Sequence, residues 1–446
     1  MNAFRSAIQL GRDGKLFLSE NAVLRYLNFS ALYLAQGAPE GITFYAIPAW
    51  LAMNGKTPTE IATYVGVVGI PWSFKILIAP VMDRFTILSM GRKRPWVIFG
   101  QLCLIISFLV IGLIPDPLNN LSGLMIAGFF ISFFGAFQDV ATDGMAVELV
   151  PEHQQARANG LMWGSKVIGV ALTLAGGTAL INTLGFSTAI PFMSVAFAFF
   201  ILIPLGFRER PGEKLLPWTK GKASQISKSI QLKSWKKILK NLFKVFILPS
   251  SLFLAPSICF NGLLNGFMDT LLPIYTIQEL GWTNTSYSQL YSVVTVVSGL
   301  FGMFVGGYLV DFYGEKKMLS IYLTSFIASL FLMTSLSAFW GYTTIIFSFI
   351  LIVTQLSVFI SIGYFASAMQ LSFKRVAATQ FTLYMAISNM GRAYGSDLVG
   401  TLKETFSWDQ IFMLIALSPA ISLVTMLFIN FKKHKVAIYK LDLITN

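Results

Sequence analysis

Three acidic residues stand close together in a stretch of sequence that is otherwise apolar. Asp139, Asp143 and Glu148 lie in FQDVATDGMAVELV, which follows the apolar run LSGLMIAGFFISFFGA. Asp139 and Asp143 are four residues apart, so a helix would place both carboxylates on one face. Two carboxylates that share an apolar site resist ionising together unless a cation neutralises one of them. This pair is therefore a candidate for binding and releasing a proton.

Other charged residues interrupt apolar runs elsewhere in the chain. Each would be costly to bury in lipid, so each is expected to be paired or functional. From the helical rise, Lys75 and Lys166 share the depth of Asp139 and Asp143, roughly 9 to 15 Å from the cytoplasmic end. Two explanations remain open: Asp139–Lys166 and Asp143–Lys75 are ion pairs that brace the helices, or one carboxylate carries a coupling proton. The remaining charged residues of this kind are Glu40, Asp269, Arg392 and Asp397.

Glu40 stands between Pro39 and Gly41, a stretch in which a helix is easily broken. Because no base of the same half shares its depth, we expect Glu40 to be an unpaired proton carrier; the alternative pairs it with Arg392. Asp269 and Arg392 are expected to form a structural or gating pair. The buried acids outnumber the buried bases, so at least one carboxylate should be protonated at neutral pH.

The composition explains why these charges are unusual. The chain has 446 residues, of which 55% are hydrophobic and only 12% charged, and its mean hydropathy is +0.68. Long apolar runs with short charged breaks are typical of a multi-pass membrane protein. The net charge of +13 lies in those breaks, so it indicates topology and not nucleic-acid binding. With two cysteines, two histidines and no nucleotide-binding loop or nucleophile elbow, we expect neither a metal, a cofactor nor an enzyme.

The apolar runs predict an all-α membrane protein with twelve transmembrane helices in two pseudo-symmetric six-helix bundles. The predicted division is a cytoplasmic segment 1–25, a bundle 26–206, a cytoplasmic linker 207–251, a bundle 252–431 and a cytoplasmic tail 432–446. Of the 33 Lys and Arg, only Lys56 and Lys403 would lie outside, and only Lys75, Lys166 and Arg392 within spans. This asymmetry predicts that both termini are cytoplasmic.

The linker contains ISKSIQLKSWKKILKNLFKVF, in which apolar residues recur at helical spacing between lysines. The recurring residues are Ile226, Ile230, Trp235, Ile238 and Leu242. This pattern predicts a helix that lies in the interface of a membrane with anionic lipid, and the alternative is a flexible basic linker.

The two halves resemble each other weakly, with Gly41 matching Gly266 and Pro48 matching Pro273. GGYLVDFYGEKK, which contains Asp311 and Lys316, resembles the loop signature of the major facilitator superfamily. The first-half copy, PVMDRFTILSMGRKRPW, departs from it, since Ala79 replaces the first glycine and extra residues follow Asp83. That departure, with YLAQGAPEGI, QDVATDGMAVEL and ATQFTLYMAISNMGR, is similar to the AmpG-like muropeptide permeases, which distantly resemble acetyl-coenzyme A transporters.

The resemblance implies a secondary transporter of alternating access in the bacterial inner membrane, driven by a proton gradient. Its cargo would be an anhydromuropeptide, or alternatively an acyl-coenzyme A, a siderophore or another organic anion. It also implies a cytoplasmic gate at the loop signatures. Helical geometry turns Glu148 away from Asp139 and toward the basic loop GRKRPW, so we expect Arg92 and Arg94 to bind it. The predicted gate residues are Asp83, Arg92, Arg94, Glu148, Asp311 and Lys316.

Polar side chains expected near the midplane are candidates for contact with a small-molecule substrate. They are Gln36, Tyr45, Gln138, Asn265, Gln380 and Tyr384. The expected partners are this substrate and membrane lipids, with no nucleic acid, and a monomer is expected.

Overall fold

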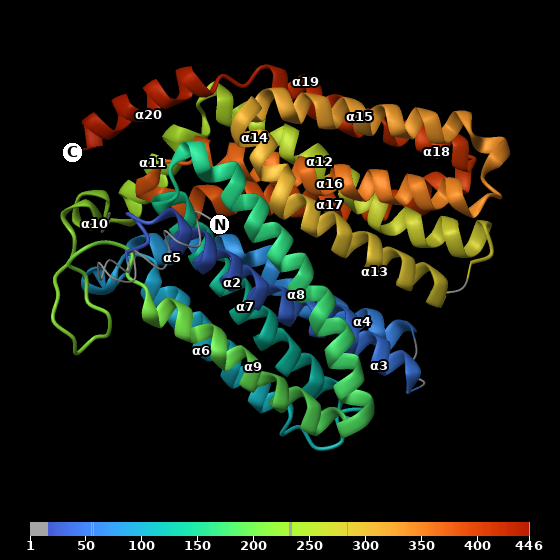
Figure 1. The fold of residues 1–446 in the computed structure, drawn as a ribbon, viewed down its shortest axis with the longest axis horizontal. Coiled ribbons are helices and arrows are strands. Elements are labelled where there is room, and N and C mark those ends of the chain that lie inside the picture. The colour runs from blue at the N-terminus through green and yellow to red at the C-terminus, as the bar shows by residue number, and fades with distance from the viewer. Residues whose placement is uncertain (1–16, 55, 57, 232–233, 283, 446) are drawn as a thin grey trace. The chain divides into compact units, whose positions relative to one another are not determined.

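The computed structural model describes residues 17–54, 56, 58–231, 234–282 and 284–445, and within them the chain is helical (Figure 1). The first half forms α2 (Ala22–Glu40), η1 (Gly41–Ala46), α3 (Ile47–Met53), α4 (Pro58–Phe74), η2 (Lys75–Leu77), α5 (Ala79–Arg84), η3 (Leu88–Met90), α6 (Arg94–Ile111), α7 (Leu121–Leu149), η4 (Glu152–Gln154), α8 (Gln155–Leu184) and α9 (Phe186–Gly206). The linker forms α10 (Gln225–Ile230) and α11 (Trp235–Phe246). The second half forms α12 (Pro249–Ile274), η5 (Tyr275–Glu279), α13 (Asn284–Phe301), η6 (Gly302–Gly306), α14 (Gly307–Tyr313), α15 (Glu315–Ser335), η7 (Ser337–Phe339), α16 (Thr343–Leu371), η8 (Lys374–Val376), α17 (Ala377–Thr405), α18 (Trp408–Ile415), α19 (Leu417–Leu427) and α20 (Phe431–Thr445).

Local sequence sets several helix ends. The Asn21 side chain accepts hydrogen bonds from the amides of Val23 and Leu24, which would otherwise lack partners at the start of α2. Asn120 does the same for Gly123 at the start of α7. Gly314 has φ +88°, a left-handed conformation that favours glycine, and it separates α14 from α15.

Nine helices of the described part are long and apolar enough to cross a membrane. Three further helical segments, 26–51, 59–82 and 376–402, complete the twelve spans that the apolar runs predict. The first contains the π-helical turn η1, the second is interrupted by the 3₁₀ turn η2 before α5, and the third is the more polar helix α17. The predicted all-α fold with two sets of six spans is confirmed.

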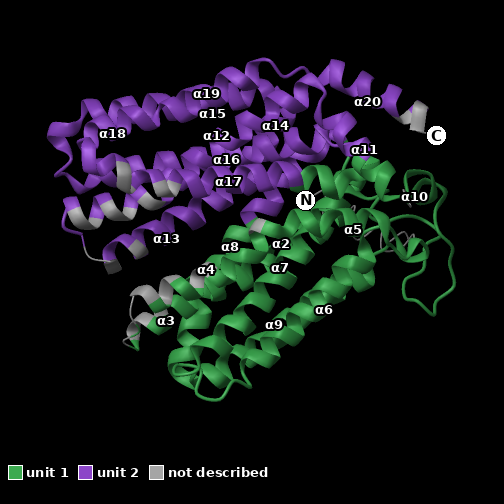
Figure 2. Cartoon of the chain, turned by 180° about the vertical axis from the view of Figure 1, so that it is seen from behind, with its two compact units in different colours: residues 1–151, 165–239, 374–382 green, residues 152–164, 240–373, 383–446 purple. Residues whose placement is uncertain are grey.

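The chain divides into two compact units (Figure 2). Unit 1 consists of residues 1–151, 165–239 and 374–382, and unit 2 consists of residues 152–164, 240–373 and 383–446. The start of α8 therefore belongs to unit 2 and the start of α17 to unit 1, so each of these two helices runs through both units.

In unit 1, α6 packs against α7 and α9, and an apolar core that includes Phe108, Ile131 and Phe197 fills the space between helices. Helices α2 and α8 cross closely at Gly37 and Gly169. A Cβ at Gly37 would overlap the carbonyl oxygen of Lys166, and a Cβ at Gly169 would overlap that of Leu34. Glycine is thus required at this crossing because it lets two backbones approach.

In unit 2, α12 crosses α17 in the same way. A Cβ at Gly266 would overlap the carbonyl oxygen of Arg392, and a Cβ at Gly395 would overlap that of Leu263. Gly266 therefore matches Gly37 in its packing, and the match with Gly41 predicted from sequence is wrong.

The linker contains two helices, α10 and α11, where one continuous helix was expected. On α11 the side chains of Ile238, Asn241 and Val245 are buried, whereas Trp235, Leu239 and Phe243 are exposed. The exposed apolar stripe therefore differs from the predicted one, which included Ile238.

Candidate functional site

The charged residues of the first half meet in unit 1, on four structural elements. Glu40 ends α2, Lys75 opens η2, Asp139 and Asp143 lie on α7, and Lys166 lies on α8. Lys75 Nζ lies 2.6 Å from Asp139 Oδ2, and both side chains are buried. Lys166 Nζ lies 2.8 Å from Glu40 Oε2. The ring of Trp72 lies close to both cations, with its centroid 5.6 Å from Lys75 Nζ and 5.2 Å from Lys166 Nζ.

This pairing corrects the one expected from depth along the helices. Asp139 pairs with Lys75 and not with Lys166, and Glu40, expected to be unpaired, is the partner of Lys166. Helical rise alone places residues at a depth, but it does not decide which side chain of that depth faces which. The close crossing of α2 and α8 at Gly37 brings Lys166 to Glu40.

Asp143 differs from Glu40 and Asp139 in its surroundings. Among the described residues, no Lys or Arg nitrogen lies within 4.0 Å of its carboxylate. Its Oδ1 accepts a hydrogen bond from the hydroxyl of Tyr33 on α2. Gln36, one helical turn further along α2, donates to Oδ1 of Asp139. Tyr33 was not predicted as a site residue, although its position three residues before Gln36 places both on one helix face.

The second half holds its own ion pair within the spans. Arg392 Nη2 on α17 lies 2.7 Å from Asp269 Oδ2 on α12. Arg392 Nε also donates to that oxygen at 2.8 Å. This agrees with the expected Asp269–Arg392 pair. The side chain of Asp397 lies outside the part that the structure describes.

A second charged cluster in unit 1 surrounds Asp83, at the end of α5. Asp83 Oδ1 binds Lys93 Nζ at 2.5 Å, and Asp83 Oδ2 accepts the backbone amide and hydroxyl of Thr379 at 2.9 and 2.7 Å. Burial by itself would raise the pKa of the Asp83 carboxyl, but Lys93 and Arg92 outweigh burial and hold that pKa below its usual range. The ionised carboxylate thus binds an amide in the first turn of α17, where the helix dipole favours negative charge.

Arg92 joins Asp83 to Glu148. Arg92 Nη1 lies 2.6 Å from Glu148 Oε1 and 2.9 Å from the carbonyl oxygen of Lys374, and Arg92 Nη2 donates to the carbonyl oxygen of Arg375 at 3.0 Å. The expected pairing of Glu148 with Arg92 is therefore present.

Arg94, expected as a second partner of Glu148, has a different role. It donates to the carbonyl oxygens of Pro204, Leu205 and Leu215, at 2.6, 3.0 and 2.6 Å. Two of these carbonyls belong to the last turn of α9, which leaves its final C=O groups without intrahelical partners. Arg94 thus caps α9 and does not contact Glu148.

Unit 2 repeats the arrangement around Asp83. Asp311 accepts the backbone amides of Ala156 and Arg157, both at 3.2 Å, at the start of α8. Lys316, the cation of the same loop signature, donates to the carbonyl oxygen of Ile429 at 3.1 Å. Each signature aspartate therefore binds the first turn of a helix that continues into the other unit.

Sequence reasoning missed two acidic residues of the linker. Glu209 accepts the backbone amides of Arg92, Lys93 and Arg94, at 2.8, 2.7 and 2.6 Å. Glu213 accepts the amide of Arg210 and the hydroxyl of Ser227. Burial and the Glu209 carboxylate raise the pKa of Glu213 to about 7. No periodic pattern marks these residues, and only two acids in an otherwise basic break, RERPGEK, could have drawn notice.

The predicted substrate contacts are scattered. Gln36 and Gln138 are buried beside the α7 carboxylates, where Gln138 donates to Thr142 at 3.2 Å. Tyr45 is exposed on η1, and Asn265 is half-buried on α12. Gln380 and Tyr384 lie within the first three turns of α17 and are fully buried, so they are neither at mid-depth nor open to a solute in this structure.

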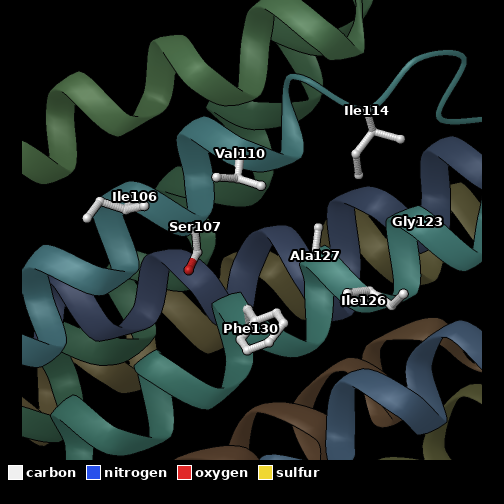
Figure 3. A pocket seen from close by; sticks show the side chains of 8 residues that line it. All are labelled: Ile106, Ser107, Val110, Ile114, Gly123, Ile126, Ala127 and Phe130. Carbon is white, nitrogen blue, oxygen red and sulfur yellow. The ribbon is translucent and has the colours of Figure 1, made fainter.

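A mostly apolar groove lies elsewhere, between α6 and α7 (Figure 3). It has a volume of about 300 Å³ and is lined by Ile106, Val110, Ile126 and Phe130 among other mostly apolar side chains. Since no charged side chain lines it, this groove is not the site of the chemistry described above.

Comparisons with known proteins show which families and structures this chain resembles. The family model described as Major Facilitator Superfamily matches residues 29–396. The anhydromuropeptide permease of Escherichia coli K12 is 26% identical over 162 residues, which cover 36% of this chain and 31% of the permease. A Rickettsia conorii protein whose name places it among the AmpG transporters is 23% identical over 414 residues, 88% of this chain and 94% of that protein.

Among solved structures, the E. coli fucose:proton symporter matches with a TM-score of 0.66 at 14% identity, covering 92% of this chain and 99% of that one. This likeness concerns the fold alone. The chain spans about a third of the length of the first curated relatives it matches.

Proposed function

Because this multi-pass chain belongs to the Major Facilitator Superfamily of membrane transporters, we propose that it imports a polar solute together with a proton, by alternating access. The membrane would be the bacterial inner membrane, with both termini in the cytoplasm. The proposed energy source is the proton gradient, with no cofactor.

The observation that carries the proton coupling is the charge balance around Asp143. Glu40 with Lys166 and Asp139 with Lys75 are two neutral pairs, so an ionised Asp143 would leave one net negative charge in the span. A proton on Asp143 makes the whole cluster neutral, which a low-dielectric site favours. Loss of that proton would draw Lys75 toward Asp143, since both carboxylates would then compete for one ammonium group.

The contacts of Asp83 and Asp311 support a gate at the cytoplasmic ends of the helices. Asp83 binds the first turn of α17, Arg92 binds the carbonyl of Arg375 in the turn η8 directly before it, and Asp311 binds the start of α8. Rearrangement of these helices during transport must break such contacts, so they would stabilise one state of the cycle relative to another.

The proposed cargo is an anhydromuropeptide. Support comes from the E. coli relative named as an anhydromuropeptide permease, with 26% identity over the matched segment. The segments QDVATDGMAVEL and ATQFTLYMAISNMGR of this chain also resemble that branch of the superfamily.

The test is uptake of labelled anhydromuropeptide into proteoliposomes, with and without an imposed pH difference. If one proton enters with each neutral solute molecule, a pH difference of one unit supplies about 1.4 kcal/mol, which sustains about tenfold accumulation of the solute. Asp143→Asn should abolish accumulation yet retain exchange of solute across the membrane, because the amide mimics the protonated acid. Glu404→Gln, at an exposed carboxylate on α17, is the matched control and should accumulate like wild type.

Two results would refute the proposal. Uptake that ignores the pH difference would remove proton coupling, and undiminished accumulation by Asp143→Asn would remove Asp143 as its carrier. Failure with anhydromuropeptide but gradient-driven uptake of another organic solute would change the cargo and keep the mechanism.

A further inference from the structure

The same helix crossing, with an ion pair beside it, occurs once in each half of the chain. Leu34, Gly37 and Glu40 follow one another at intervals of three on α2, as Leu263, Gly266 and Asp269 do on α12. On the partner helices, a cation precedes the crossing glycine by three residues: Lys166 before Gly169, and Arg392 before Gly395. The backbone overlaps that force glycine are the same in both halves, so the two ion pairs occupy equivalent places.

The two equivalent pairs differ in how open they are. The side chains of Lys166 and Glu40 are 12% and 24% exposed, and the indole ring of Trp72 covers Lys166. The side chains of Arg392 and Asp269 are 54% and 37% exposed. One copy of the repeated pair is therefore enclosed within its unit, and the other is accessible.

The accessible pair lies within the spans and not at a helix end. Arg392 is about 22 Å from the start of α17, near the middle of a helix of 29 residues. A guanidinium and a carboxylate exposed at that depth would be costly to hold in hydrocarbon, so the pair must face water. A charged pair in water within a transporter's spans is accessible to a polar solute.

The contact between the two side chains is not the strongest that a guanidinium and a carboxylate can form. Two contacts of Arg392 go to one oxygen, Asp269 Oδ2, at 2.7 and 2.8 Å. A guanidinium binds most strongly when two nitrogens face the two oxygens of one carboxylate. Because an exposed ion pair contributes little to stability, the exchange of Asp269 for another carboxylate has a small energetic cost. Asp269 would then be available to an ammonium group.

We propose that Asp269 and Arg392 form a recognition site for a zwitterionic solute, with Arg392 binding a carboxylate and Asp269 binding an ammonium group. The site deepens the proposed function, since it rests on the chain being a solute transporter. It specifies the chemical class that the transporter selects: a solute with a free carboxylate and a free amine, such as the end of a peptide.

The test compares free and blocked forms of two probes on the purified full-length chain. The probes are anhydromuropeptide and tri-alanine, each also prepared with its carboxylates amidated or its amine acetylated. Thermal stabilisation in detergent reports binding without any gradient. Wild type should prefer the free form of at least one probe. Arg392→Gln should weaken binding of the free form by about tenfold or more and leave the amidated form unchanged.

Charge reversal separates recognition from a merely structural role. The double variant Asp269→Arg with Arg392→Asp restores an ion pair at the crossing, so its melting temperature should stay near that of wild type, while its preference for the free probe should disappear. Lys403→Gln, at an exposed cation further along α17, is the control and should bind like wild type.

The proposal is overturned if wild type binds neither probe, if it binds free and blocked forms alike, or if the charge-reversed variant keeps the preference. These outcomes are distinct from failure of the proposed function. Proton coupling fails by loss of gradient-driven uptake, whereas the binding measurement uses no gradient.

Discussion

Asp83→Asn tests how strongly the charged cluster of unit 1 holds the start of α17. The Asp83 carboxylate is fully buried and receives Lys93 Nζ at 2.5 Å, Arg92 Nη2 at 3.6 Å and both donors of Thr379. The amide side chain is uncharged and would turn an NH₂ group toward one of these donors. Lys93, also fully buried, would then keep the carbonyl of Met82 at 3.3 Å and the weaker ion pair with Glu148, whose Oε1 lies 3.9 Å away.

Removing one partner of a buried ion pair costs about 3 to 5 kcal/mol, because the other charge is left without compensation. Part of this cost is relieved if the start of α17 separates and water reaches Lys93. If about 3 kcal/mol falls on that local equilibrium, opening increases by roughly a factor of 150, at 1.36 kcal/mol per tenfold.

The assay is hydrogen exchange of the full-length chain, read at peptides that cover residues 374–382. Asp83→Asn should accelerate exchange there by roughly a factor of 150 and leave α6 and α7 much less affected. Thr379→Val is the matched control, because it removes the hydroxyl donor and keeps the amide. It should accelerate exchange by roughly a factor of 5, the effect of one hydrogen bond of about 1 kcal/mol. Unchanged exchange at 374–382 in Asp83→Asn would refute the claim that Asp83 holds this turn.

Three further predictions concern other parts of the molecule. Burial and Glu209 raise the pKa of Glu213 to about 7 in the folded state, whereas the unfolded state loses this proton near pH 4.5. The free energy of unfolding therefore falls as the pH rises through 7. Glu213→Gln should therefore match wild type in melting temperature at pH 4 and exceed it at pH 8, by up to roughly 3 kcal/mol of stability; equal curves at both pH values would contradict this. Gly266→Ala should lower the melting temperature by forcing α12 away from the Arg392 carbonyl, whereas Gly206→Ala, with no atom within 4 Å of the added carbon, should not. In nanodiscs, brominated anionic lipid should quench the fluorescence of the α11 tryptophan more than brominated neutral lipid does. This difference should shrink when four lysines of α11 become glutamine, because about 1 kcal/mol of attraction is lost per lysine: Lys236, Lys237, Lys240 and Lys244. Quenching that does not depend on lipid charge would rule out the anionic interface.

Several features of this protein follow from composition and spacing. The apolar runs specify membrane-spanning helices because lipid leaves no other way to satisfy backbone hydrogen bonds. The spacing of Asp139 and Asp143 places both on one face of α7, and the position of Glu148 turns it toward Arg92, as the structure has it. These predictions need only the periodicity of one helix.

Other features depend on how helices cross. The partner of Lys166 is Glu40 and not Asp139, because Gly37 and Gly169 let α2 and α8 approach at one particular rotation. Arg94 caps α9 and does not bind Glu148, because the linker with Glu209 folds back onto the amides of residues 92–94. A depth along one helix cannot predict such contacts, since they depend on the rotation of two helices and on loops between them.

The sequence by itself therefore determined that this chain crosses a membrane many times and that it carries more acids than bases inside the spans. Hydrophobicity and helical period act along the chain and can be read from it. Only the tertiary structure decided that Asp143 is the carboxylate without a cation among the described residues, that each signature aspartate holds the first turn of a distant helix, and that one of two equivalent ion pairs is more exposed than the other. Those outcomes arise from close backbone approach at glycines and from burial, which exist only once the helices have packed.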